Sequence, residues 1–333
     1  MKTCLVTGAT GCVGSHVAER LISHGWHIRT LVRAASDTRL IDQWGVQKIE
    51  GDLTDAAALQ RAASGVDLIV HCAAKVGDWG PVDEYRRANV EGTRVLLETA
   101  AGQKLNRFVH VSSLGVYEAR DHFGTDESTP PATKHIDGYT QSKMESEKLV
   151  LEYHKTRGVP VAVIRPGLIY GPRDRVVVPR LVEKIGNGQF RYFGSSDKAM
   201  NSIFVGNLVE AIMLAIEKPA AVGQVYNVTD DDPTSKRRFF GTAARLAGLP
   251  EPTRSIPLGL ARFLAPISVF IAGLRGKPPL INPARIKFLG LNLDYSCEKI
   301  KRELGYKPRW TFDQGMKETI EWFRAEKLIR SAA

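Results

Sequence analysis

The first half of the chain alternates short apolar runs with longer segments of helical periodicity. This alternation is typical of βαβ units, in which helices cover both faces of a parallel sheet. The apolar runs predict strands over residues 3–6, 27–32, 46–50, 68–72, 108–112 and 161–165. The segments between them predict helices over residues 13–24, 85–101 and 139–157. We therefore expect an α/β fold with a doubly wound parallel sheet, and a ligand crevice at the carboxyl ends of its strands.

The second half departs from this rhythm. Turn residues follow Ile169, a helix ends near Gly186, and an apolar run over 225–228 is expected to return to the sheet. From Pro233 onward the pattern is helical and interrupted by prolines. We predict a dinucleotide-binding Rossmann domain and a smaller, mostly helical C-terminal substrate lobe. The first comprises residues 1–170, with 201–230 returning to it, and the second comprises 171–200 and 231–333.

One apolar stretch, residues 256–274, allows two interpretations. It contains Arg262 and two prolines, so it is too interrupted for a transmembrane helix. We favour a pair of helices that face the core of the small lobe. The alternative is an amphipathic lid that admits a greasy substrate from a membrane surface, which would add a peripheral membrane contact.

Composition narrows the classes of function. The cysteines have no CxxC spacing and the eight histidines no ligand pairing at helical intervals, so we expect no metal site and a reduced, cytoplasmic protein. A net charge of +10 would attract phosphates or acidic lipids. Basic residues are spread along the chain without a DNA- or RNA-reading motif, so we expect no nucleic-acid partner.

The turn after the first strand reads TGATGCVG over residues 7–14. Its glycines permit a tight turn, a close approach of the backbone to a pyrophosphate, and close packing of helix on strand. The following helix N-terminus offers unpaired N–H groups to phosphates. We predict that this turn binds a dinucleotide through Gly8, Thr10, Gly11, Cys12, Val13 and Gly14.

Three further strand ends extend the predicted cofactor site. The second strand ends at Arg33, where NAD-binding proteins usually carry an acidic residue. Arg33, with Arg39, could bind a 2'-phosphate, so NADP(H) is favoured and NAD(H) is the alternative. Asp52 is expected to accept a hydrogen bond from the adenine amine. Two small residues after the fourth strand, Ala73 and Ala74, leave space for ribose and diphosphate. Leu53, which follows Asp52, is also included in the predicted cofactor site.

Tyr139 and Lys143 carry the predicted chemistry. They are one helical turn apart, so their side chains stand on one face. A free tyrosine has a pKa of about 10 and is a poor base. We expect the adjacent ammonium and the positive nicotinamide ring to lower the pKa of Tyr139, so that it exchanges a proton with a substrate alcohol during hydride transfer. Lys143 would also bind the ribose hydroxyls.

Ser112 and Ser113 end the fifth strand in the crevice. We assign Ser113 to the reacting oxygen and Ser112 to the cofactor. A second YxxxK sequence begins at Tyr295, but it lies at the start of a late, charged helix without a serine partner, so we expect no catalytic role for it.

These motifs resemble the extended short-chain dehydrogenase/reductase superfamily, also described as the NAD-dependent epimerase/dehydratase family. The matching segments are TGATGCVG at residue 7, NVEGT at 89, VSSLGVY at 111, YTQSK at 139 and RPGLIYGP at 165. The resemblance implies a Rossmann domain, a Ser113–Tyr139–Lys143 triad and a structural or cofactor-adjacent role for Asn89. It also implies pairing of helices 85–101 and 139–157 in a homodimer. Nicotinamide contacts are implied for Pro166, Gly167, Leu168 and Ile169.

The branch within the superfamily is less direct. Leu114 and Gly115 stand where sugar dehydratases carry an acidic pair, and residues 167–170 lack the asparagine of nucleotide-sugar epimerases. The tail LNLDYSCEKIKRELGYKP looks more like the 3β-hydroxysteroid and sterol-carboxylate dehydrogenases. Arg33 departs from that branch, where an acidic residue is usual.

Three hypotheses follow. The first is a dehydrogenase or ketoreductase that interconverts a secondary alcohol and a ketone on a lipophilic small molecule, such as a steroid or terpenoid. The second is a nucleotide-sugar epimerase that uses the same triad and holds a diphosphate with Arg173, Arg175 and Arg180. The third is a dinucleotide-sensing regulatory protein, against which the intact triad argues because sensing needs no proton transfer.

Overall fold

A central parallel sheet of seven strands organises the computed structural model, which describes residues 2–175 and 177–329. In sheet order the strands are β11 (Gln224–Val228), β7 (Val161–Pro166), β5 (Arg107–Val111), β4 (Leu68–His71), β1 (Thr3–Thr7), β2 (His27–Val32) and β3 (Gln47–Glu50). All seven predicted strands are confirmed to within two residues. The order reverses between β1 and β4, which is where sheets of this kind bind ligands.

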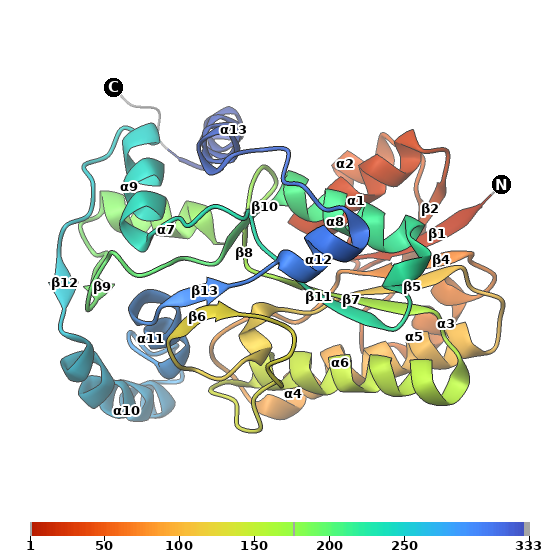
Figure 1. Cartoon of the computed structure of the whole chain (residues 1–333), viewed down its shortest axis with the longest axis horizontal. Coiled ribbons are helices and arrows are strands. Elements are labelled where there is room, and N and C mark those ends of the chain that lie inside the picture. Colours follow the sequence, from red (N-terminus) through yellow and green to blue (C-terminus); the bar gives the residue numbers. More distant parts are fainter. Residues whose placement is uncertain (1, 176, 330–333) are drawn as a thin grey trace.

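Helices bury both faces of this sheet (Figure 1). One face is covered by α1 (Cys12–Ser23), α8 (Val205–Glu217) and α12 (Glu298–Leu304), and the other by α3 (Ala56–Ala63), α5 (Gly92–Ala101) and α6 (Gly138–Arg157). This double cover explains why the strands read as continuous apolar runs rather than as alternating patterns. The Rossmann architecture expected from the sequence is confirmed.

The predicted helix over 85–101 is interrupted. It consists of α4 (Val82–Arg86), a π-helical segment (Arg87–Glu91) and α5. The wide turn carries Asn89, whose buried side chain accepts from the backbone N–H of Lys75 at 2.7 Å. A π-helical turn holds one residue more than an α-turn and is common at functional sites.

The smaller lobe packs around an aromatic core that includes Tyr170, Phe239, Phe240 and Phe312. Its helices are α7 (Val178–Gly186), α9 (Lys236–Leu246), α10 (Leu258–Arg275), α11 (Pro283–Gly290) and α13 (Phe312–Ala325). Short parallel strand pairs brace it: β8 (Leu168–Tyr170) with β10 (Ser202–Phe204), β9 (Tyr192–Phe193) with β12 (Ser255–Ile256), and β6 (His122–Thr125) with β13 (Leu293–Tyr295). A short helix, α2 (Arg39–Asp42), follows β2.

Two expectations for the C-terminal part need correction. Residues 297–306 were assigned to the small lobe, but Ile300, Leu304 and Tyr306 pack into the core beneath the sheet with α8 and β11. Residues 256–274 were expected to form a core-facing helix pair. They form one continuous helix, α10, which tolerates Pro266 and buries only a narrow face of Ala261, Ala265 and Ala272.

Buried polar contacts attach α6 to the sheet. Glu147 forms an ion pair with Arg165 of β7, and the two side chains are 3% and 4% exposed. The same carboxylate accepts a hydrogen bond from the Ser112 hydroxyl at 2.7 Å, and Arg165 donates to the Tyr117 hydroxyl at 2.7 Å. These contacts fix the helix that carries Tyr139 against the ends of β5 and β7.

The substitution Glu147→Gln should lower the free energy of unfolding by about 3 to 5 kcal/mol, because it leaves the buried Arg165 charge without a counter-charge. Urea denaturation monitored by circular dichroism would measure the change. Glu145→Gln is the matched control on the same helix, since Glu145 pairs with Arg86 near the surface and should change stability by about 1 kcal/mol or less. Equal effects of the two substitutions would contradict this account of α6 docking.

Candidate active site

The glycine-rich turn between β1 and α1 has the shape that a pyrophosphate requires. Gly8 adopts a left-handed φ of +75°, and its carbonyl accepts from the Gly11 N–H at 2.9 Å. A Cβ on Gly14 would lie 2.2 Å from the Gly8 carbonyl oxygen, so only glycine fits there. The turn thus places the N-terminus of α1 beside the crevice, which is the arrangement that binds dinucleotide phosphates. Thr10 lies within the turn, Val13 is the second residue of α1, and the Cys12 thiol points to the Pro172 carbonyl at 3.4 Å.

A cavity of about 270 Å³ lies beyond this turn, at the ends of β2 and β3. It is lined by Arg33, Ala34, Glu50, Gly51, Asp52, Thr54 and Asp55. Arg33 is exposed and makes no ion pair within the described ranges. Hydrogen bonds from the Thr54 hydroxyl and backbone N–H lower the pKa of Asp52, and the Arg33 charge adds to this effect. The structure therefore places an arginine and a charged carboxylate around the position expected for the adenosine end.

Arg39, the second arginine expected at the 2'-phosphate, forms an ion pair with a neighbouring carboxylate. Its guanidinium forms a two-pronged pair with Asp37, at 2.9 and 2.7 Å. Arg175 binds the same carboxylate at 3.0 Å. Asp37 thus neutralises part of the charge of Arg39 in this structure, although the Arg39 side chain is 82% exposed. The predictions for Arg33 and Arg39 both stay predictions.

Small residues and a buried hydrogen-bond chain shape the floor of the crevice. The Ala73 N–H donates to the Thr7 hydroxyl at 3.1 Å, and Ala73 lies against Gly8. Thr7 and Thr93 bond the two ring nitrogens of His71, at 2.8 and 3.0 Å. Burial lowers the pKa of His71 to about 3, so the ring is neutral. This chain of hydrogen bonds ties β1, β4 and α5 together. Leu53 and Ala74 are partly buried and lie three residues after the ends of β3 and β4.

The triad lies at the start of α6. The Asp137 carboxylate caps the helix by accepting from the Thr140 N–H at 2.7 Å, which places Tyr139 in the first turn. The Ser113 side chain lies close enough to the Tyr139 hydroxyl to lower its pKa, and its own hydroxyl oxygen accepts from the Gly115 N–H at 3.0 Å. One turn later, the buried Lys143 ammonium donates to the Val111 carbonyl at 2.6 Å. The three residues that the sequence placed together are together in the structure.

Burial dominates the titration of this triad. It raises the pKa of Tyr139 to about 12, although the nearby Ser113 side chain opposes the rise. It also lowers the pKa of Lys143 to about 8, against the charges of Cys72 and Glu147. The sequence interpretation expected the Lys143 ammonium to lower the pKa of Tyr139. That part is wrong for the protein alone, because the ammonium is directed at the Val111 carbonyl instead.

Ser112 and Asn89 support the triad from below. The Ser112 hydroxyl is buried and donates to Glu147, so its hydrogen bond is directed into the core rather than toward a cofactor. Asn89 donates to the Ser142 hydroxyl at 2.9 Å and to the Lys75 carbonyl at 3.0 Å, which joins the π-helical turn to α6. The resemblance implied a structural or a cofactor-adjacent role for Asn89, and these contacts fit the structural role.

The segment after β7 leaves the sheet and turns over the crevice. Pro166 is the last residue of β7, and the Gly167 N–H donates to the Val228 carbonyl at 3.1 Å. A Cβ on Gly167 would lie 1.9 Å from the Asn201 carbonyl oxygen, so glycine is required. Leu168 and Ile169 then form β8 and are partly buried between the sheet and the small lobe.

The second YxxxK sequence forms no comparable site. Tyr295 is the last residue of β13 and stacks on Tyr117, with ring centroids 5.4 Å apart. Lys299 lies in α12 and donates to the Val225 carbonyl at 3.1 Å. Because the two residues belong to different elements, they do not share a helix face.

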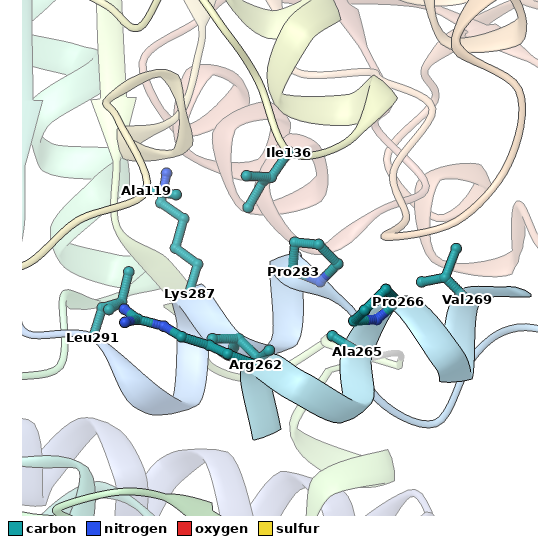
Figure 2. A pocket seen from close by; sticks show the side chains of 10 residues that line it. Ala119, Ile136, Arg262, Ala265, Pro266, Val269, Pro283, Lys287 and Leu291 are labelled. Atoms are coloured by element: carbon teal, nitrogen blue, oxygen red, sulfur yellow. The ribbon is translucent and has the colours of Figure 1, made fainter. Parts of the chain in front are cut away.

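An apolar cavity of about 430 Å³ lies between α10, α11 and the loops at residues 119 and 136 (Figure 2). It is lined by Ala119, Ile136, Arg262, Ala265, Pro266, Val269, Pro283, Ile286, Lys287 and Leu291. The Lys287 ammonium donates to the carbonyls of Gly115 and Tyr117 at 3.1 and 2.7 Å, and so holds the loop that follows Ser113. Burial lowers the pKa of Lys287 to about 8. The volume and apolar lining suit a small-molecule site.

Sequence reasoning missed this cavity almost entirely. Lys287 and Arg262 carry no motif, and they line the cavity only because α10 and α11 fold back over the loops before Tyr139 and after Ser113. The prolines of the C-terminal part indicate where helices end, but not how those helices are oriented in the fold. Glu147 was also missed, although its position one turn beyond Lys143 places it on the same helix face.

Comparison with known proteins agrees with this geometry. Residues 4–229 match the model of the NAD dependent epimerase/dehydratase family. The 4-hydroxy-2-methyl-3-oxo-4-farnesyl-3,4-dihydroquinoline-1-oxide ketoreductase of Stigmatella aurantiaca is 31% identical over 95% of each chain. The decarboxylating sterol-4-alpha-carboxylate 3-dehydrogenase of Mus musculus is 29% identical over 97% of this chain and 91% of its own.

A solved structure shows the same fold. The UDP-glucuronic acid 4-epimerase of Bacillus cereus, in complex with UDP-glucuronic acid and NAD, superposes with a TM-score of 0.76 at 21% identity, over 97% of this chain and 99% of the epimerase. With the glycine turn, the triad and the family match in place, the chain belongs to the NAD-dependent epimerase/dehydratase family of extended short-chain dehydrogenases/reductases and is an oxidoreductase.

Proposed function

We propose that this protein is an NADP(H)-dependent dehydrogenase or ketoreductase that interconverts a secondary alcohol and a ketone on a lipophilic substrate. One observation carries the proposal: an apolar cavity lies beside the segments that precede Tyr139 and follow Ser113. Lys287 lines that cavity and bonds to the loop after Ser113, and Ile136 lines it three residues before Tyr139. A substrate in the cavity would therefore present its reacting oxygen to both hydroxyls of the triad.

We assign each side chain a role in the transfer of the hydride and the proton. The nicotinamide, when bound, accepts or supplies the hydride. Ser113 would hold the substrate oxygen by a hydrogen bond, and Tyr139 would exchange the proton with that oxygen. The buried Lys143 charge would stabilise the phenolate as it forms and is placed to bind ribose hydroxyls. Asp137 caps the helix that carries Tyr139, and Lys287 holds the loop that follows Ser113.

The lipophilic substrate class rests on two observations. Eight of the ten residues that line the cavity are apolar, and the exceptions are Arg262 and Lys287. The relatives named above act on a farnesylated quinoline oxide and on a sterol carboxylate. Two of the arginines that would hold a sugar nucleotide are occupied, since Arg173 pairs with Glu19 at 2.7 Å and Arg175 with Asp37. No contact of the described residues favours an epimerase.

We further propose a homodimer in the cytoplasm. The dimer rests on the resemblance, which implies pairing through α5 and α6. The cytoplasmic location rests on the cysteines: all four are free thiols, and two of them are fully or almost fully buried.

Cofactor preference can be tested at Arg33. Arg33→Ala should weaken NADPH binding by about ten- to a hundredfold, the effect of losing a charge-assisted contact to a phosphate, and leave NADH binding unchanged. Fluorescence titration of both dinucleotides measures this. Arg39→Ala is the control, because Arg39 is already paired with Asp37, and it should leave both affinities unchanged. Equal loss of NADPH and NADH affinity in the Arg33 variant would contradict the assignment.

The reaction itself can be tested at Tyr139. With a panel of hydrophobic ketones and NADPH, the wild-type protein should show loss of reduced-nucleotide absorbance. Tyr139→Phe should lower turnover by about a hundred- to ten-thousandfold while retaining cofactor affinity. Tyr295→Phe is the control: within the described chain the Tyr295 hydroxyl has no hydrogen-bond partner, so its loss should leave turnover unchanged. Silence of the wild type across the panel would count against the proposal.

A further inference from the structure

Helix α10 presents an uncovered apolar face at the outer edge of the small lobe (Figure 1). Phe263 and Phe270 are each 68% exposed and Leu274 is 75% exposed. We define the α10 apolar face as these residues together with Leu260, Ile267, Ile271 and Leu280, all of them exposed. The helical members follow spacings of three and four, so they form one stripe that extends along the helix. A soluble protein seldom leaves so large a contiguous patch bare.

The opposite side of the same helix forms a wall of the substrate cavity. Ala265, Pro266 and Val269 line that cavity, as Figure 2 shows from within. Ala261 and Ala265 pack on Phe193 and Ile286 in a small core of their own. The cavity and the α10 apolar face are therefore separated by the thickness of one helix, about 10 Å.

The charged residues of the segment that contains this helix are all basic. The sequence contains no acidic residue between Glu251 and Asp294. The exposed basic residues within this interval are Arg254, Arg262, Arg275 and Lys277, which lie before, within and after α10. Basic residues beside an apolar face attract anionic headgroups while the apolar side chains enter the acyl boundary.

We infer that α10 docks on the surface of an anionic lipid bilayer and places the cavity beside it, so that a lipophilic substrate reaches Tyr139 from the membrane. The inference about substrate entry rests on the proposed function; the docking surface does not. A second copy of the chain fits this face less well. A two-fold contact would bring the basic residues at the ends of α10 near the basic residues of the other copy, and these like charges repel.

The helix lies on the bilayer rather than across it. Within the described residues, α10 alone is long and apolar enough to span, by length and composition. Spanning would, however, strip Ala261 and Ala265 from their contacts in the small lobe and carry Arg262 into the hydrocarbon. A surface position keeps both the packing and the hydration of the arginine.

Vesicle flotation with the full chain tests the docking. Wild-type protein should float with vesicles of phosphatidylcholine containing about one-third phosphatidylglycerol, bind less to pure phosphatidylcholine, and bind less in high salt. The double substitution Phe263→Asp with Phe270→Asp should weaken binding by at least about tenfold. Phe123→Asp is the control, since Phe123 is 78% exposed on β6, and it should bind as the wild type does.

Two results would overturn the inference. The first is absence of wild-type protein from both kinds of vesicle. The second is a dimer in analytical ultracentrifugation that the double substitution dissociates while vesicles recruit neither form, which would assign the face to a second copy. If the double phenylalanine variant does not fold, the double substitution Arg275→Glu with Lys277→Glu tests the inference instead. In the same flotation assay it should abolish the preference for anionic vesicles. Turnover of a water-soluble ketone, measured in parallel without vesicles, reports separately on the proposed function.

Discussion

The attachment of α6 to the carboxyl ends of β5 and β7 is the constraint on which the site depends. Two charged side chains of this helix, Lys143 and Glu147, are buried where few waters can reach them. Each is tolerated because it has a fixed partner, the Val111 carbonyl for Lys143 and Arg165 for Glu147. Buried charges without such partners would destabilise the fold. The partners therefore fix both the rotation and the height of α6, and through them the position of Tyr139 opposite Ser113.

The same burial sets the chemistry. A phenol with a pKa raised to about 12 stays protonated in the protein alone, and is thus ready to donate a proton to a ketone. Formation of the phenolate, needed for alcohol oxidation, requires a positive charge nearby. The Lys143 amine, with a pKa of about 8, and an oxidised nicotinamide would supply that charge together. In the proposed reaction, the direction of proton transfer would thereby be coupled to the redox state of the cofactor.

The sequence predicted those features that depend on residues close together in the chain. Apolar runs gave every strand of the sheet, and the spacing of Tyr139 and Lys143 gave the triad, because both depend on neighbours in the chain. Long-range packing was not predictable in this way. The placement of α12 against the sheet, the outward face of α10 and the contact of Lys287 with the triad loop all depend on how the tail folds back. The ion pair of Arg39 with Asp37 was also not predictable from the motif, because it depends on the orientation of two side chains.

The most direct test of this account is the ionisation of Tyr139, followed by ultraviolet difference titration or by NMR of tyrosine labelled at Cζ, with Tyr139→Phe to identify the signal. The account predicts a pKa of about 12 in the protein alone, and a clear fall when oxidised NADP is bound but not when the reduced form is bound. A pKa that is the same in all three states would contradict the central claim that this phenol faces the nicotinamide.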